Sequence, residues 1–134
     1  MAVQEEYLDV LQNIEFAIVS TSHDHPEMVD AHVIWALEAV IGSYRAERAG
    51  RTPEEFSASS VEADLYRAIR NICEWRLGCL HPDDAEAAEL GPAPEPVTLE
   101  EIMLCLKRIL KSVRRWNKSG GRRGYLTFIV QYVR

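Results

Sequence analysis

The chain has 134 residues and a net charge of −6, with 47% hydrophobic and 27% charged residues, values that are ordinary for a globular protein. This length suits one domain that can fold without disulfide bonds or metal ions as staples. No apolar run reaches the ~20 residues that cross a bilayer, and the acidic start MAVQEEYLDVLQ is unlike a signal peptide, so we expect one cytoplasmic domain over residues 1–134.

The first predicted helix covers residues 4–20. Apolar side chains recur there every three or four residues, which is the spacing of one helix face. That face contains Tyr7, Leu11, Ile14 and Ile18. Phe16 falls nearly opposite it and indicates an apolar contact on a second side.

A second helix is predicted over residues 31–49, with Asp30 as its N-cap and Gly50 as its left-handed terminator. One apolar face contains Val33, Leu37, Val40 and Tyr44, and the reverse face contains Trp35, Ala39, Gly42 and Ala46. A helix that is apolar on two faces is either central in a bundle or holds another subunit.

The third helix is predicted over residues 61–77, ended by Gly78. Residues 81–97 are acidic and rich in alanine and proline, a composition that predicts a flexible linker within the domain. Thr98 and Glu101 then form a capping box for a fourth helix that ends near Trp116.

The tail over residues 125–133 fits a strand or a helix, but the rest of the sequence offers no strand to pair with it. We therefore expect a short C-terminal helix. The fold class predicted is all-α, a bundle of four main helices plus this short one.

The charge is distributed unevenly. Residues 1–106 carry a balance of −15, whereas residues 107–134 carry +9 with no acidic side chain at all. The basic residues follow one face of the fourth helix and continue into a glycine-containing loop, and arginines and exposed glycines in this pattern suit an anion. The candidate binding residues are Lys107, Lys111, Arg114, Arg115, Lys118, Arg122, Arg123 and Tyr125.

Three interpretations of these basic residues are open. They can neutralise the acidic half of the same chain or of a second subunit, bind an acidic protein partner, or bind nucleic acid or a phosphate ligand, with Tyr125 stacking on a base. The acidic net charge disfavours the third, because it weakens long-range attraction to a polyanion.

The sequence gives little indication of metal binding, disulfide formation or catalysis. His23, His25 and His32 stand among carboxylates, but their spacing matches no zinc motif, and we interpret them as part of a polar turn; no metal or cofactor is expected. Three cysteines without framework spacing predict reduced thiols, with Cys79 as a small buried side chain. An enzyme with a site between helices is permitted but not indicated.

No motif assigns the chain to a family of known function. We expect a non-enzymatic protein–protein interaction or regulatory module, with nucleic-acid or phosphate binding as the alternative. The two-faced second helix also predicts a homodimer whose interface contains Phe16, Trp35, Ala39, Gly42 and Ala46.

Overall fold

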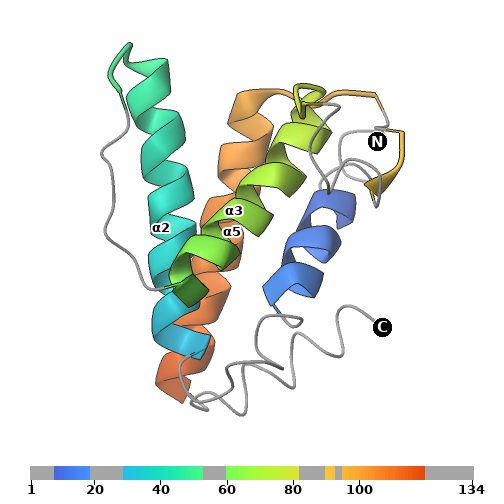
Figure 1. Ribbon diagram of the computed structural model, residues 1–134. Helices are drawn as coiled ribbons and strands as arrows, with labels where there is room; N and C mark the ends of the chain where they lie inside the picture. The colour runs from blue at the N-terminus through green and yellow to red at the C-terminus, as the bar shows by residue number, and fades with distance from the viewer. Residues whose placement is uncertain (1–7, 19–28, 53–59, 82–89, 93–94, 120–134) are drawn as a thin grey trace.

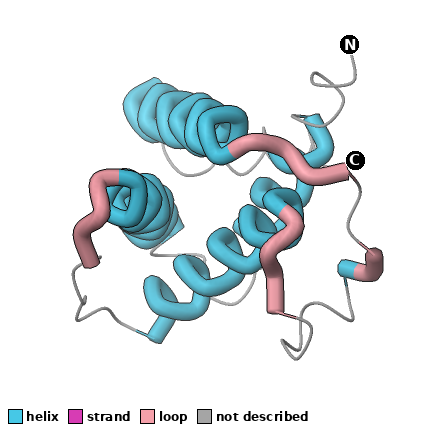
Figure 2. Tube along the Cα trace, turned by 90° about the horizontal axis from the view of Figure 1, so that it is seen from above, coloured by secondary structure: helices cyan, strands magenta, loops and turns pink. Residues whose placement is uncertain are grey.

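The structure is a computed structural model, and it describes residues 8–18, 29–52, 60–81, 90–92 and 95–119. Four helices dominate these residues, and no strand occurs among them (Figure 2). They are a helix over residues 8–18, α2 (Val29–Arg48), α3 (Ser60–Leu77) and α5 (Leu99–Ser119). The predicted all-α bundle is confirmed. The predicted C-terminal helix over residues 125–133 lies outside the described residues.

The central helix is α2, which packs against both α3 and α5. In Figure 1, α2 and the helix over residues 8–18 stand on opposite sides of α3, and α5 runs behind them. The predicted apolar face of α2 is fully buried in this arrangement, since Val33, Leu37, Val40 and Tyr44 are at most 3% exposed. Other buried residues of α2, among them Ala36 and Ile41, widen this apolar face, so that α2 can contact two neighbouring helices.

The other helices supply the rest of one core. Ile14 and Ile18 enter it from the first helix, and Leu65 and Ile69 enter it from α3. On α5, four apolar residues that recur every three or four positions are buried, and they are Ile102, Leu106, Ile109 and Val113. Burial of these apolar faces is the main driving force for the bundle.

The helix ends follow local sequence rules. Gly50 and Gly78 adopt positive φ values of 74° and 76°. The N–H groups of each glycine and of the residue after it donate the two backbone hydrogen bonds of a Schellman motif. The capping box is also present, because Glu101 N donates to Thr98 Oγ1 and Thr98 N donates to Glu101 Oε2. One prediction is wrong: α2 begins at Val29, so Asp30 lies inside its first turn instead of capping it.

Part of the predicted linker lies against the end of α3. Trp75 Nε1 donates to the carbonyl of Gly91 at 3.1 Å, and Val97 N donates to the carbonyl of Arg76 at 3.1 Å. Pro96 packs so closely over Gly78 that a Cβ there would lie 2.8 Å from its Cγ. The flexibility expected of residues 81–97 stays a prediction.

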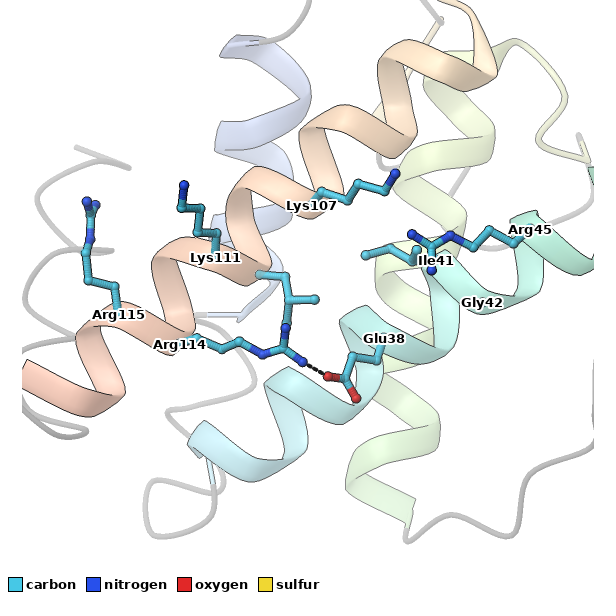
Figure 3. A pocket seen from close by; sticks show the side chains of 9 residues that line it. Glu38, Ile41, Gly42, Arg45, Lys107, Lys111, Arg114 and Arg115 are labelled. Carbon is cyan, nitrogen blue, oxygen red and sulfur yellow. Dashed lines mark hydrogen bonds and ion pairs between the residues drawn. The ribbon is translucent and has the colours of Figure 1, made fainter.

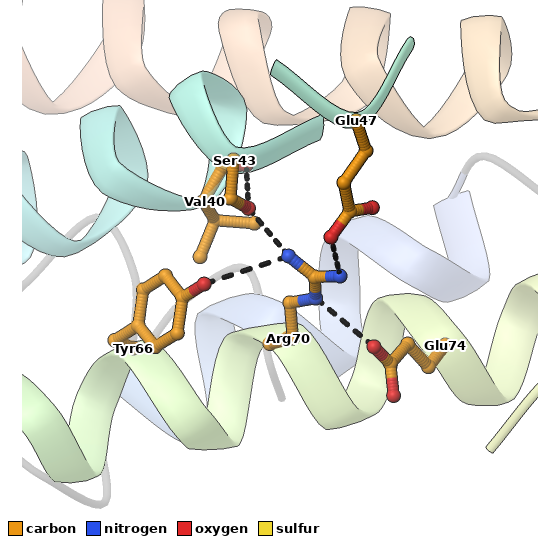
Figure 4. A network of polar contacts seen from close by, with 6 residues as sticks. All are labelled: Val40, Ser43, Glu47, Tyr66, Arg70 and Glu74. Carbon is orange, nitrogen blue, oxygen red and sulfur yellow. Dashed lines mark hydrogen bonds and ion pairs between the residues drawn. The ribbon is translucent and has the colours of Figure 1, made fainter. Parts of the chain in front are cut away.

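A single arginine joins α2 to α3 through polar contacts. Arg70 on α3 donates to Glu47 on α2 at 2.6 Å and to Glu74 on its own helix at 3.0 Å. Figure 4 shows the same guanidinium reaching Ser43 and Tyr66 (2.5 and 3.5 Å). The side chain of Arg70 is 18% exposed, so these bonds compensate the loss of its hydration.

We predict that Arg70→Met lowers the free energy of unfolding by about 2 kcal/mol, because the change leaves two carboxylates and a hydroxyl without their cation. The matched control is Arg67→Met, whose arginine is 68% exposed and pairs with the equally exposed Asp64. The control should stay within about 0.5 kcal/mol of wild type. Urea titration of both variants measures the difference, and equal losses would contradict a special role for Arg70.

Candidate functional site

An open groove of about 930 Å³ runs between α2 and α5. The two helices lie antiparallel, so the second half of α2 faces the middle of α5. The groove is the setting of most of the basic residues singled out in the sequence. Its lining consists of Glu38, Ile41, Gly42, Arg45, Lys107, Leu110, Lys111, Arg114 and Arg115.

Four of the predicted anion-binding residues meet in this groove. Lys107, Lys111, Arg114 and Arg115 all line it from α5, as their helical spacing predicts. The structure adds Arg45 from α2, which the sequence analysis missed (Figure 3). Arg45 was not predicted as part of this set, because it belongs to residues 1–106, whose net charge is −15. No local sequence pattern relates it to α5.

The remaining predicted residues are not placed. The side chain of Lys118 is not described, and Arg122, Arg123 and Tyr125 lie outside the described residues. Whether they extend the basic surface stays a prediction.

Two ion pairs join α2 to α5. Arg114 reaches across to Glu38 near one end, and Arg48 Nη2 lies 2.8 Å from Glu100 Oε1 near the other. Between them, Lys107 and Arg45 extend toward one another from opposite helices in Figure 3. Exposed pairs of this kind contribute little to stability, so they orient side chains more than they hold the fold together.

The other four cations of the groove have no acidic partner within the described part of the chain. These four are Arg45, Lys107, Lys111 and Arg115. Like charges crowded along one groove raise the local positive potential, even on a chain whose net charge is −6. The groove is therefore suited to an anionic ligand.

The floor of the groove is apolar. Ile41 and Leu110 form it and are 4% and 8% exposed, and Gly42 adds no side chain beside them. A Cβ built on Gly42 meets no atom within 4 Å, so the space above this residue is open. Apolar floor and cationic rim together suit a ligand that presents both carbon and negative charge.

Catalytic chemistry has few candidates in this groove. Its only carboxylate, that of Glu38, is paired with Arg114, and no histidine, cysteine or hydroxyl residue is among those that line it. A nucleophile with a positioned base is thus not assembled by these residues.

The predicted dimer residues occupy different surroundings. Phe16 is 59% exposed on the first helix, whereas Trp35 packs against the core. Ala39 and Ala46 are partly buried, and Gly42 lies in the basic groove. The set does not form one uniform apolar face, and the dimer stays a prediction.

The histidines give no metal site in the described residues. His32 lies on α2 and its Nδ1 stands 2.9 Å from Glu62 on α3, while His23 and His25 fall outside the described ranges. Nowhere in those ranges do three potential metal ligands come together.

The three thiols are poorly disposed to act as nucleophiles. Burial raises the pKa of Cys73, Cys79 and Cys105, in the last case to about 12, so each favours the protonated form at neutral pH. The expectation that Cys79 is buried is wrong: α3 ends at Leu77, and Cys79 stands beyond it as an exposed residue. The predicted stripe did not extend past the terminating Gly78.

One buried carboxyl group was not anticipated. Glu15 on the first helix is 3% exposed, and its Oε2 has no hydrogen-bond partner in the described part of the chain. Burial raises the pKa of this group from its usual 4.5 to about 7. No pattern in the sequence distinguishes it from a surface glutamate, because only its packing decides its environment.

This pKa predicts a dependence of stability on pH. Between pH 4.5 and 7 the folded chain keeps a proton on Glu15 that the unfolded chain releases. The free energy of unfolding should therefore fall as pH rises across that interval, by on the order of 2–3 kcal/mol, and level off above it. Glu15→Gln should remove this component. Denaturant titrations at several pH values measure it, with the exposed Glu100→Gln as the control that should keep the wild-type slope.

No protein-family model matches the chain, and no significant match was found among curated proteins or among solved structures. Nor does any helix among the described residues have the length and apolarity needed to span a membrane.

Proposed function

We propose that this protein is a non-enzymatic interaction module that binds an acidic, amphipathic segment of a partner protein in the groove between α2 and α5. The observation that carries this proposal is the combination of cations at the rim, which have no acidic partner among the described residues, with Ile41 and Leu110 at the floor. An acidic helix with one apolar face presents the complementary pattern.

The charge arrangement supports recognition more than tight binding. Cations that remain exposed until a partner arrives increase the rate of association and set its orientation. Because such contacts are screened, binding should weaken as the salt concentration rises. The carbon stems of the lysines and arginines supply most of the affinity that salt does not reduce, because Ile41 and Leu110 are already largely buried.

Nucleic acid is the alternative ligand with the same negative charge. A polynucleotide backbone would use the cationic rim but has little use for the apolar floor, and the net charge of −6 opposes its approach. These two observations favour the acidic peptide.

A direct binding measurement tests the proposal. The probes are a fluorescent helical peptide with glutamates on one face and leucines on the other, and a short single-stranded oligonucleotide of similar charge. Fluorescence anisotropy should show salt-dependent binding of the peptide that unlabelled oligonucleotide displaces only at large excess.

Charge reversal locates the binding surface. The double variant Lys107→Glu/Lys111→Glu should weaken peptide binding roughly tenfold or more, which corresponds to about 1.4 kcal/mol. The control is Arg108→Glu, a reversal on the same helix at an exposed residue that does not line the groove, and it should change affinity less than threefold. Equal effects would place binding elsewhere, and preferential binding of the oligonucleotide would support the alternative.

We further infer that the protein is a cytoplasmic homodimer in which the first helix contributes to the interface. Phe16 supports this inference, because it is 59% exposed and aromatic side chains are enriched at the centre of subunit interfaces. Gly42 belongs both to the face expected in the dimer and to the groove, so contacts at that residue would compete with a bound peptide.

The dimer is tested by the mass of the intact particle in native mass spectrometry. Wild type should appear at twice the chain mass of 15.2 kDa, and Phe16→Asp should appear at the single mass. Leu104→Asp is the matched control, since Leu104 is 54% exposed on α5 and lies outside the predicted interface. A wild-type monomer at micromolar concentration would contradict the inference.

A further inference from the structure

The most deeply buried charged residue in the described ranges lies at the end of α3. Arg76 is 0% exposed, and it is the largest fully buried side chain among the described residues. A buried guanidinium stays charged, and it needs compensating partners.

Its compensation is incomplete. Nη1 donates to the carbonyl of Glu95 at 3.4 Å, a long hydrogen bond, whereas Nε and Nη2 have no hydrogen-bond partner among the residues that the structure describes. The nearby C-terminus of α3 carries only partial negative charge. Arg70, six residues earlier on the same helix, is by contrast surrounded by two carboxylates, a hydroxyl and a phenol. The two arginines of α3 therefore differ in how fully their charge is compensated.

The two unpartnered atoms of Arg76 share one edge of the guanidinium group. Nε–H and the adjacent N–H of Nη2 point in parallel, and this pair forms the bidentate fork that grips two oxygens of a carboxylate or a phosphate. The two free donors therefore lie side by side and form a complete oxyanion-binding fork.

Residues 95–97, hereafter the strap, cover this arginine. The strap is joined to α3 by the bond from Val97 N to the Arg76 carbonyl and by the contact of Pro96 with Gly78. Glu95 and Pro96 are themselves exposed. Val97 also packs against the core, so an oxyanion would reach Arg76 by local opening of these contacts.

We propose that Arg76 is an oxyanion-binding residue, and that its Nε/Nη2 fork takes a carboxylate or phosphate group beside the strap. This site is separate from the groove between α2 and α5, because none of the residues that line the groove belongs to α3 or to the strap. A bound oxyanion would supply the counter-charge that the protein itself does not place on this edge.

Thermal unfolding of the full chain tests the proposal, with inorganic phosphate, acetate and chloride as probes at equal ionic strength and pH. Phosphate or acetate should raise the unfolding temperature saturably, by at least about 2 °C over chloride. The anion with the larger effect identifies the class of group. No rise over chloride with either anion would overturn the proposal.

Two variants assign any rise to this residue. Arg76→Met keeps an unbranched apolar stem at this position but removes the fork, so it should lose the rise. The groove variant Lys107→Glu/Lys111→Glu should keep it, which separates this site from the proposed partner-binding function. An equal rise in Arg76→Met would overturn the proposal.

A direct readout covers the case in which Arg76→Met does not fold. In wild-type protein labelled with ¹⁵N, the Nε–H signal of Arg76 should shift when phosphate or acetate is added and stay in place with chloride. A signal that does not respond to either oxyanion would overturn the assignment whether or not the variant folds.

Discussion

The architecture depends on α2, which must hide apolar side chains from water along more than one face. A single neighbouring helix covers only one stripe, so α2 requires α3 and α5 together. Val40 and Tyr44 lie at the centre of this arrangement and are almost completely buried. The positions of the other helices follow from that requirement, and the first helix completes the core from the far side of α3.

The groove is a by-product of the same packing. Where α2 and α5 diverge above Ile41 and Leu110, their surfaces beside the core are left to long charged side chains, which can keep their heads in water. The antiparallel direction of the helices places Arg45 opposite Lys107, although the two are far apart in sequence. A cationic surface thus arises between two helices, one from each half of a chain whose charge is strongly asymmetric.

Buried polar groups divide into those that the fold satisfies and those that it does not. Arg70 is surrounded by acceptors and strengthens the contact between α2 and α3 (Figure 4). Arg76 and Glu15 are more deeply buried and keep polar atoms without partners. Incomplete compensation of this kind is costly, and proteins tend to retain it where a ligand or a change of protonation uses it.

The sequence by itself determined the local structure. Apolar periodicity located the helices, Gly50 and Gly78 marked two of their ends, and the Thr98–Glu101 pair marked a start, because each of these signals acts within a few residues. It also located the basic face of α5. Only the tertiary structure decided that Arg45 joins that face and that Glu15 and Arg76 are buried, since these outcomes depend on contacts between helices that no local pattern encodes.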